Sequence, residues 1–249
     1  MISTRDRLGL LVQEALAQAL SLLTYYSIEA WLRARRYAIP DCRRTRAEFE
    51  AQVARERGAL LICANHLTLI DSLIIQWALT PGWRLPLRRD LFTWNLPDRH
   101  NLFRKRAVRV LGYLGKCIPV IRRATPEETR RTLDKVAFLL RRGQSVLIFP
   151  EGGRSRVGRV DTENLTYGVG RILQETPGAR VLCVYARGRG QREFSNYPRT
   201  GERFFVRLRR ITPSTGLSGM RGARDLATQV ITQLSDMETE YFEHAGVDR

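Results

Sequence analysis

One histidine and one aspartate, five residues apart, follow the end of a predicted strand. His66 comes after the apolar run 59–63, which is typical of a buried strand, and Asp71 comes just before the apolar segment 72–79, which is typical of a helix. Ligands of α/β sheets collect at the carboxyl ends of strands, so a histidine in this turn can touch a substrate. The aspartate can bind one ring nitrogen and leave the other as a base. The spacing by itself is common and is weak evidence for catalysis.

A second apolar strand signal, residues 145–149, is also followed by polar and flexible residues. These are Pro150, Glu151, Gly152, Gly153, Arg154, Ser155 and Arg156. Paired glycines allow a ligand to approach the backbone closely, and arginine side chains bind anions in a bidentate manner. This second turn strengthens the case that His66 belongs to a site for an anionic substrate.

The two turns resemble motifs of the glycerophospholipid acyltransferases, the lysophosphatidic acid acyltransferase group. The first motif is Asn65-His66-x4-Asp71, and the second is Phe149-Pro150-Glu151-Gly152-x-Arg154-Ser155. Between them, residues 115–122 are similar to the family's intermediate block, an apolar strand that ends in arginine. The resemblance covers about residues 59–187, and the order of the blocks makes it far more specific than either motif alone.

The resemblance implies an enzyme that moves a fatty acyl group from acyl-CoA or acyl carrier protein to the hydroxyl of a lysophospholipid, lysophosphatidic acid to phosphatidic acid. It implies that His66 is the general base and that Asp71 orients it. Direct transfer needs no metal or other cofactor. The substrate-binding positions that we predict are Asn65, Arg88, Arg122, Glu151, Gly152, Gly153, Arg154 and Ser155. Arg154 and Arg122 would hold the acceptor phosphate, and Asn65 would shape the turn or bind the developing oxyanion. For Arg88 a solvated surface arginine is the competing interpretation.

Three departures from the family pattern leave the acceptor open. Gly153 replaces the usual threonine, Ile121 a frequent aspartate, and Tyr185 the usual proline of the fourth block. An alternative is therefore an enzyme of the same family that acts on a non-glycerol acceptor, such as an ornithine or other amino lipid, or a hydroxylated polyketide or polyene.

The net charge of +17 favours anionic partners, and 39 of the 42 basic residues are arginines. Phospholipid surfaces and phosphorylated substrates fit this charge. A catalytically inactive basic protein that binds membranes or nucleic acid is a further alternative. The chain has no nucleic-acid motif of known spacing, so nucleic acid is the less favoured partner.

Residues 1–40 predict an amphipathic helical segment, either one long helix or two short ones between Arg5 and Tyr37. Its uncharged part, residues 15–28, is too short to span a bilayer. It would either pack on the core or form a monotopic anchor, with arginines on lipid phosphates. The resemblance favours the anchor, at the cytoplasmic face of the inner (plasma) membrane, peripheral or monotopic.

Residues 41–249 predict one α/β domain with a mixed, mostly parallel sheet flanked by helices. The further elements that we predict are a helix in 45–57, a strand within 83–92, a strand at 116–120, helices at 126–142 and 164–175, strands at 179–186 and 203–211, and a final helix at 221–244. Thr125, Pro126 and Glu128 form a strong helix start, and the following strand should be parallel to the one before it. The four cysteines have no metal-type spacing, and we expect Cys63 to be a buried hydrophobic residue rather than a nucleophile.

Overall fold

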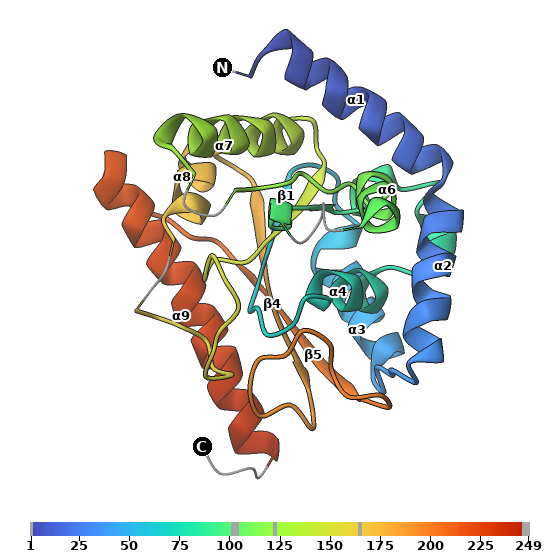
Figure 1. Ribbon diagram of the computed structural model, residues 1–249. Helices are drawn as coiled ribbons and strands as arrows, with labels where there is room; N and C mark the ends of the chain where they lie inside the picture. The colour runs from blue at the N-terminus through green and yellow to red at the C-terminus, as the bar shows by residue number, and fades with distance from the viewer. Residues whose placement is uncertain (1, 101–104, 122–123, 164–165, 246–249) are drawn as a thin grey trace.

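The computed structural model describes residues 2–100, 105–121, 124–163 and 166–245 and contains a five-stranded sheet (Figure 1). The strands lie in the order β2 (Trp94–Asn95), β3 (Ser145–Ile148), β1 (Leu60–Ala64), β4 (Arg180–Gly188) and β5 (Phe204–Ile211). Strands β2, β3, β1 and β4 are mutually parallel, and β5 is antiparallel to β4. This confirms the predicted mixed, mostly parallel sheet.

Helices cover both faces of the sheet (Figure 1). One face is covered by α7 (Pro126–Arg141), α8 (Gly168–Glu175) and α9 (Gly219–Ala245), and the other by α3 (Cys42–Phe49) and α4 (Asp71–Leu79). Successive residues of a strand point to opposite faces, so Leu61 and Cys63 join the first core while Leu60 and Ile62 join the second. A strand buried on both sides explains why the β1 sequence is apolar throughout.

Helix α7 begins as its sequence predicts. The Thr125 side chain accepts a hydrogen bond from the backbone of Glu128, and the Glu128 side chain accepts one from the backbone of Thr125. This reciprocal cap and the proline at the first position fix the start of the helix. The strand that follows, β3, is parallel to its neighbours, as we expected.

The region between α4 and α7 differs most from the prediction. Residues 83–92 contain no strand; they form the 3-10 helices η2 (Gly82–Arg84) and η3 (Arg89–Leu91), because local turn hydrogen bonds satisfy their backbone. The strand of this region is β2, just after them. Within the described part of the predicted strand 116–120, Cys117 forms an isolated parallel bridge with Asn95 of β2 and Val120 forms one with Asp98, next to α6 (Arg106–Leu114). Helix α3 ends in a short π-helix, η1 (Glu50–Ala54).

The N-terminal segment forms two helices, α1 (Thr4–Ala19) and α2 (Ser21–Ala34), with a bend of 67° between them. Among the described residues no single helix is long and apolar enough to cross a membrane, whereas α1 and α2 reach that threshold only when taken together as a bent pair. Polar side chains attach the pair to the domain. Gln13 Nε2 donates to the carbonyl oxygens of Tyr113 and Cys117, and Gln18 Nε2 donates to that of Leu85.

Candidate active site

The turn between β1 and α4 brings His66 and Asp71 together. We call residues 65–71 the His66 loop. Nδ1 of His66 lies 2.9 Å from Oδ2 of Asp71, so the predicted pair is formed. The Asp71 carboxylate accepts hydrogen bonds, so it holds the proton on Nδ1 and leaves Nε2 as the basic nitrogen of the neutral ring. The His66 side chain is 16% exposed, which allows a substrate to reach it.

Three further donors fix the Asp71 carboxylate. The backbone N–H groups of Leu67 and Thr68 donate to Oδ2 at 2.6 and 2.8 Å, and the Thr68 hydroxyl donates to Oδ1. Asp71 is also the first residue of α4, where the helix dipole favours a negative charge. Convergent donors of this kind hold the carboxylate in one orientation, and the carboxylate in turn holds the imidazole.

The ring of Phe149, at the end of β3, stacks on the His66 ring with centroids 4.0 Å apart and an angle of 16°. This contact covers one face of the imidazole and leaves the ring edge for hydrogen bonding. Cys63, three residues before His66, is fully buried, and burial raises the pKa of its thiol well above the usual value. The thiol therefore has the properties of a core residue rather than of a nucleophile.

Glu151 holds the backbone of His66. We call residues 150–161 the Glu151 loop. Glu151 Oε1 accepts a hydrogen bond from the N–H of His66 at 2.9 Å, and Oε2 accepts one from the N–H of Asp161 at 3.3 Å. Burial raises the pKa of the Glu151 carboxyl to about 8, and the nearby Glu238 and Asp161 carboxylates act in the same direction. The two strand-end loops are thus joined at His66.

Gly152, Gly153 and Ser155 have different surroundings within the Glu151 loop. Gly152 has φ +67°, and a Cβ there would collide with the side chain of Thr166, so its role is to form the turn. A Cβ at Gly153 would meet nothing within 4 Å. Ser155 is buried; its N–H donates to the carbonyl oxygen of His66 and its hydroxyl accepts from the N–H of Arg159. Gly152 and Ser155 therefore shape the site, and Gly153 borders open space.

Arg154 lies against the connection between β4 and β5, which we call the 189–203 loop. Its Nη1 donates to the carbonyl oxygen of Ser195 at 3.2 Å and to Oδ1 of Asn196 at 2.8 Å, and its guanidinium lies 5.5 Å from the centre of the Phe194 ring. The same loop is bound to the His66 loop, because the N–H of Ser195 donates to Leu67 and the N–H of Leu69 donates to Asn196. Arg154 is thus placed beside the histidine loop, as predicted.

Asn65 shapes the turn and does not face a substrate. Its Nδ2 donates to the carbonyl oxygen of Ala186 at 3.0 Å, and its Oδ1 accepts from the N–H of Ala186 at 2.8 Å. The side chain thereby continues the pairing of β1 with β4 after the backbone has left the sheet. Of the two roles that the sequence left open for Asn65, the geometry supports the structural one.

One predicted phosphate-binding arginine, Arg88, is not brought to this site. Arg88 forms a bidentate ion pair with Asp90, at 3.0 and 2.8 Å, near the amino ends of the strands. The adjacent Arg89 carbonyl accepts from Lys116, which also donates to Gln144 just before β3. Arg88 therefore lies near the amino ends of the strands, whereas His66 lies at their carboxyl ends, because the chain passes Arg88 before it enters β2. Arg122 lies outside the described residues.

Glu238 and Tyr185, which the sequence did not mark as site residues, support the Glu151 loop at the end away from His66. Glu238 of α9 accepts a hydrogen bond from the N–H of Val160 at 3.0 Å and another from the Tyr185 hydroxyl at 3.2 Å. Burial raises the pKa of Glu238. Tyr185 stands where the family usually has proline, and this departure was the one sequence signal for the contact. Its partner Glu238 is more than fifty residues away along the chain, so the sequence pattern could not identify it.

A histidine held by a fixed carboxylate, at the carboxyl end of a parallel strand, is an arrangement that can act in general-base catalysis. The family model described as Acyltransferase matches residues 45–187, more than half of the chain. The chain belongs to the Acyltransferase family and is an acyltransferase.

A similar solved structure is that of the 1-acyl-sn-glycerophosphate (LPA) acyltransferase PlsC from Thermotoga maritima, with 17% sequence identity and a TM-score of 0.44. The similarity covers 89% of this chain and 97% of that chain. It is too distant to transfer a substrate or a mechanism. No curated protein sequence matches the chain.

Proposed function

We propose that the protein transfers a fatty acyl group from a thioester donor, acyl-CoA or acyl carrier protein, to the hydroxyl of a lysophospholipid, with lysophosphatidic acid as the acceptor. The observation that carries this proposal is the His66–Asp71 pair, with Nδ1 bound to the carboxylate at 2.9 Å and the ring partly exposed. The family assignment supplies the acyl transfer, and the neighbouring Arg154 supplies a reason to expect a phosphorylated acceptor.

In the proposed reaction Nε2 of His66 removes the proton from the acceptor hydroxyl while its oxygen attacks the thioester carbonyl. The new C–O ester bond forms and the C–S bond breaks, and the proton passes from the imidazolium to the departing thiolate. Asp71 stabilises the imidazolium and keeps the correct tautomer. A thiolate is a good leaving group, so no covalent enzyme intermediate is required.

Arg154 is proposed to hold the phosphate of the acceptor. Its hydrogen bonds to Ser195 and Asn196 go to neutral oxygens, and a phosphate is a stronger partner for a guanidinium. Binding the phosphate beside the His66 loop fixes the hydroxyl near Nε2, and such positioning supplies a large part of the rate enhancement in two-substrate reactions.

The test of this proposal is release of free thiol from palmitoyl-CoA, measured with and without lysophosphatidic acid. Wild-type protein should release thiol only when the acceptor is present. We expect His66→Ala to lower the rate by about 10²–10⁴, because it removes a positioned base. Equal turnover of a folded His66→Ala protein would refute the mechanism. Thiol release that does not depend on any acyl acceptor would refute the transfer.

An alternative acceptor is favoured by one observation, the open space beside Gly153 where the family usually has threonine. Open space at this position would admit an acceptor of another shape, such as a lyso-ornithine or other amino lipid, or a hydroxylated polyketide or polyene. With one fixed donor, acylation of such an acceptor at a higher kcat/KM than lysophosphatidic acid would select this alternative.

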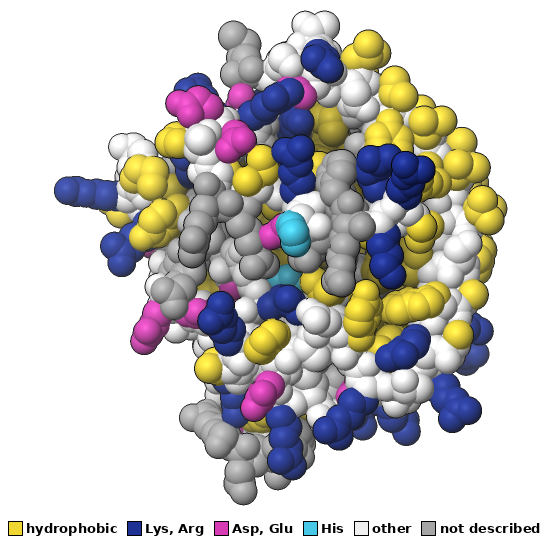
Figure 2. Space-filling model, viewed as in Figure 1, with side chains coloured by type: hydrophobic (Ala, Val, Ile, Leu, Met, Phe, Trp, Pro, Cys, Tyr) yellow, Lys and Arg dark blue, Asp and Glu magenta, His cyan; other side chains and the backbone are white. Residues whose placement is uncertain are grey.

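We also propose that α1 and α2 bind the phospholipid surface of the membrane, at its anionic cytoplasmic face. The orientation of α1 supports this. Gln13 and Glu14 are buried against the domain, whereas the exposed positions of the two helices are largely apolar: Leu8, Leu11, Val12, Leu16, Leu20, Leu22, Leu23, Tyr26 and Trp31. Hydrophobic side chains accordingly line the right-hand edge in Figure 2, the side on which α1 and α2 lie in Figure 1. A helix that buries polar groups and exposes leucines is suited to a lipid interface.

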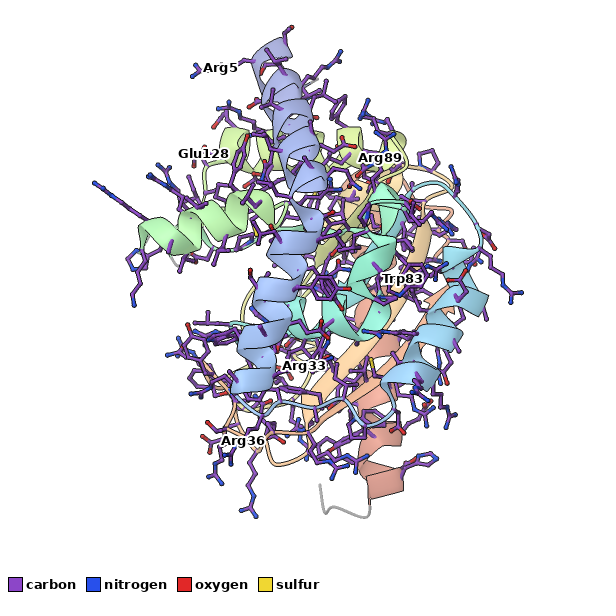
Figure 3. All side chains as sticks on the ribbon, turned by 90° about the vertical axis from the view of Figure 1, so that its right-hand side faces the viewer. Arg5, Arg33, Arg36, Trp83, Arg89 and Glu128 are labelled. Carbon is purple, nitrogen blue, oxygen red and sulfur yellow. The ribbon has the colours of Figure 1, made fainter. Side chains whose placement is uncertain are left out.

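Arginines lie at both ends of this apolar surface. Figure 3 shows Arg5 at the far end of α1, and Arg33 and Arg36 at the end of α2. Replacing Leu8 and Leu23, which are 63% and 65% exposed, by serine should weaken binding to anionic vesicles at least about tenfold. The matched control replaces Leu217 and Met220, which are 54% and 55% exposed near the start of α9. Equal losses in the two double variants, measured by vesicle cosedimentation, would refute the proposed surface.

A further inference from the structure

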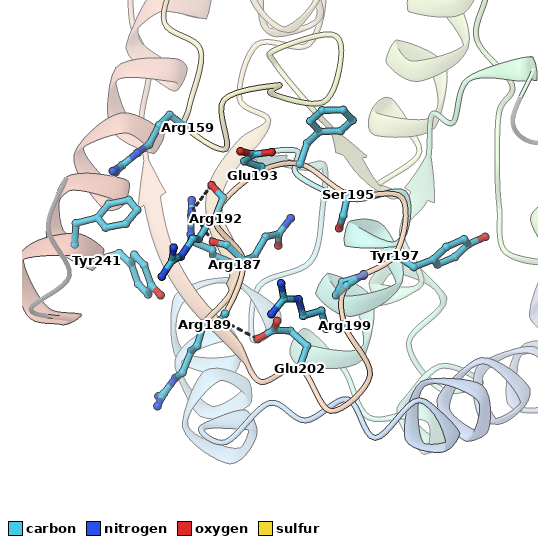
Figure 4. Close-up of a pocket in the computed structure, with 15 residues that line it drawn as sticks. Arg159, Arg187, Arg189, Arg192, Glu193, Ser195, Tyr197, Arg199, Glu202 and Tyr241 are labelled. Carbon is cyan, nitrogen blue, oxygen red and sulfur yellow. Dashed lines mark hydrogen bonds between the residues drawn. The ribbon is translucent and has the colours of Figure 1, made fainter.

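A large open cavity lies between the 189–203 loop, the residue Arg159 and the end of α9 (Figure 4). Its volume is about 1250 Å³, more than a drug-sized ligand needs. The lining includes five arginines: Arg159, Arg187, Arg189, Arg192 and Arg199. We call it the arginine basin. It does not include His66 or Asp71, so it is separate from the proposed catalytic pair.

The positive charge of the basin is only partly used by the protein. Arg187 is structural, because its guanidinium donates to the carbonyl oxygens of Gly158 and Gln191. Arg189, Arg192 and Arg199 are exposed, and within the described ranges none of them forms an ion pair with a carboxylate. The lining also contains two glutamates, Glu193 and Glu202. Glu202 accepts hydrogen bonds from the backbone N–H groups of Gly190 and Arg203.

Aromatic side chains alternate with the arginines around the basin. They are Phe194, Tyr197, Tyr241 and Phe242. Figure 4 shows Arg159 and Tyr241 on one side of the cavity and the loop with Arg192, Tyr197 and Arg199 on the other. Guanidinium groups bind phosphates, and aromatic rings stack on nucleobases. In addition, Gln191 Nε2 and Ser195 Oγ in the wall have no hydrogen-bond partner among the residues described.

The basin is connected to the catalytic loops through one segment of the 189–203 loop. Phe194 and Ser195 line the basin, and Arg154 contacts both of them. The N–H of Ser195 also donates to the carbonyl oxygen of Leu67, the residue next to His66. A ligand in the basin therefore lies one loop away from the proposed reacting centre. A donor that extends along this loop would have one end in the basin and the other at His66.

We propose that the arginine basin binds the phosphorylated nucleotide part of an acyl-CoA donor, its adenosine 3′,5′-bisphosphate group. This inference rests on the proposed function, in which the donor is a thioester. The concave shape favours a nucleotide over the protein surface of a carrier, because the arginines and aromatic side chains line a hollow that a small ligand can enter. The phosphates contact Arg189, Arg192 and Arg199, and the adenine stacks on an aromatic ring of the lining.

The test compares two triple variants that lose the same charge. The basin variant carries Arg189→Ala, Arg192→Ala and Arg199→Ala, and the control carries Arg43→Ala, Arg130→Ala and Arg224→Ala, all exposed positions outside the lining. Calorimetry should show that wild type and control bind adenosine 3′,5′-bisphosphate equally. The basin variant should bind about tenfold to a hundredfold more weakly, since charge-assisted hydrogen bonds to phosphate are lost. Equal affinity in the two variants, or no binding to wild type, would overturn the proposal.

Activity with two donors separates this site from the proposed function. The basin variant should lose at least about tenfold in kcat/KM with palmitoyl-CoA but nothing with palmitoyl-pantetheine, which has no nucleotide. A raised KM for lysophosphatidic acid with palmitoyl-pantetheine would instead assign the basin to the acceptor phosphate and overturn the proposal. Bisphosphate binding without transfer from either donor would leave the site standing and refute the proposed function. Transfer from palmitoyl-CoA at equal rates in both triple variants would support the proposed function and overturn the nucleotide site.

Discussion

The His66 loop and the Glu151 loop each carry a carboxyl group that contacts His66, yet the two groups have different roles. Asp71 binds the ring at Nδ1, and its other donors come from within its own loop. Glu151 binds the backbone N–H of His66 from another strand end. The first carboxylate sets the tautomer and orientation of the base, and the second sets the position of the residue that carries it. The geometry proposed for catalysis depends on two contacts of 2.9 Å that come from different parts of the chain.

Asp71→Asn should give the largest effect, because it changes the ring contact. An amide oxygen can accept from fewer of the converging donors than a carboxylate, and the amide N–H₂ would favour the wrong tautomer of His66. We expect kcat to fall by about 10²–10⁴, the range typical of losing a positioned base. Steady-state transfer with a saturating donor measures it.

The control for Asp71→Asn is Ser72→Ala, the next residue on α4. It should leave kcat within a factor of about two, as expected for a partly exposed side chain outside the pair. If Asp71→Asn retained kcat within a factor of three of wild type while folded, the ring contact would not matter for the reaction, and the distinction between the two loops would fail.

Glu151→Gln should give a smaller loss of activity and a distinct effect on stability. Glutamine keeps an oxygen for the His66 N–H, but above the pKa of Glu151 it places an N–H₂ group opposite the N–H of Asp161 where the wild type has an ionised oxygen. We therefore expect kcat to fall there by about tenfold, equivalent to roughly 1.4 kcal/mol. The pKa of Glu151, about 8 when folded, lies above its unfolded value, so the folded protein binds more protons between the two values. The contribution of this group to stability is complete below pH 4.5 and is lost as the pH rises through 8.

Urea unfolding at several pH values measures this contribution. The free energy of unfolding of wild type relative to Glu151→Gln should decrease between pH 5 and pH 8, since glutamine does not titrate. A difference between the two proteins that stayed constant, or increased with pH, would show that Glu151 is ionised in the folded state throughout this range.

The sequence predicted the parts of this site that are local. The apolar run of β1, the turn with His66 and Asp71, and the capped start of α7 each depend on residues within a few positions of one another. Periodicity and capping rules describe such segments well. The resemblance also indicated the Glu151 loop and Arg154, because they belong to a contiguous block of the sequence.

The parts that were wrong or missed depend on contacts between distant segments. The resemblance predicts Arg88 in the site, but the direction in which the chain enters β2 places it at the opposite ends of the strands. The sequence predicts that Lys116 begins a strand, but this residue is fully buried and donates to the Arg89 and Phe92 carbonyls and to Gln144. Hydrogen bonds that span more than twenty residues leave no periodic signal in the sequence.

The Tyr185 hydroxyl offers the smallest and most selective test of how the Glu151 loop is held. Tyr185→Phe removes the hydroxyl that donates to Glu238 and also contacts Arg187, so it should destabilise the protein by about 0.5–1.5 kcal/mol. In this variant Glu238 still accepts a hydrogen bond from the N–H of Val160, and Glu151 still accepts one from the N–H of Asp161. We therefore expect kcat to fall by less than about threefold. Tyr113→Phe, at an exposed tyrosine of α6, is the control and should change neither quantity.

A double-mutant cycle of Tyr185→Phe with Glu151→Gln then decides whether α9 acts on His66 through the Glu151 loop. The connection runs from the Tyr185 hydroxyl through Glu238 to the N–H of Val160, and from the neighbouring Asp161 through Glu151 to His66. If the loop transmits the constraint, the Tyr185→Phe loss of kcat should disappear once Glu151 has been replaced, because the groups form one network. If the two losses add, the Glu238 contacts stabilise α9 without positioning the base, and Glu151 alone connects the second loop to the first.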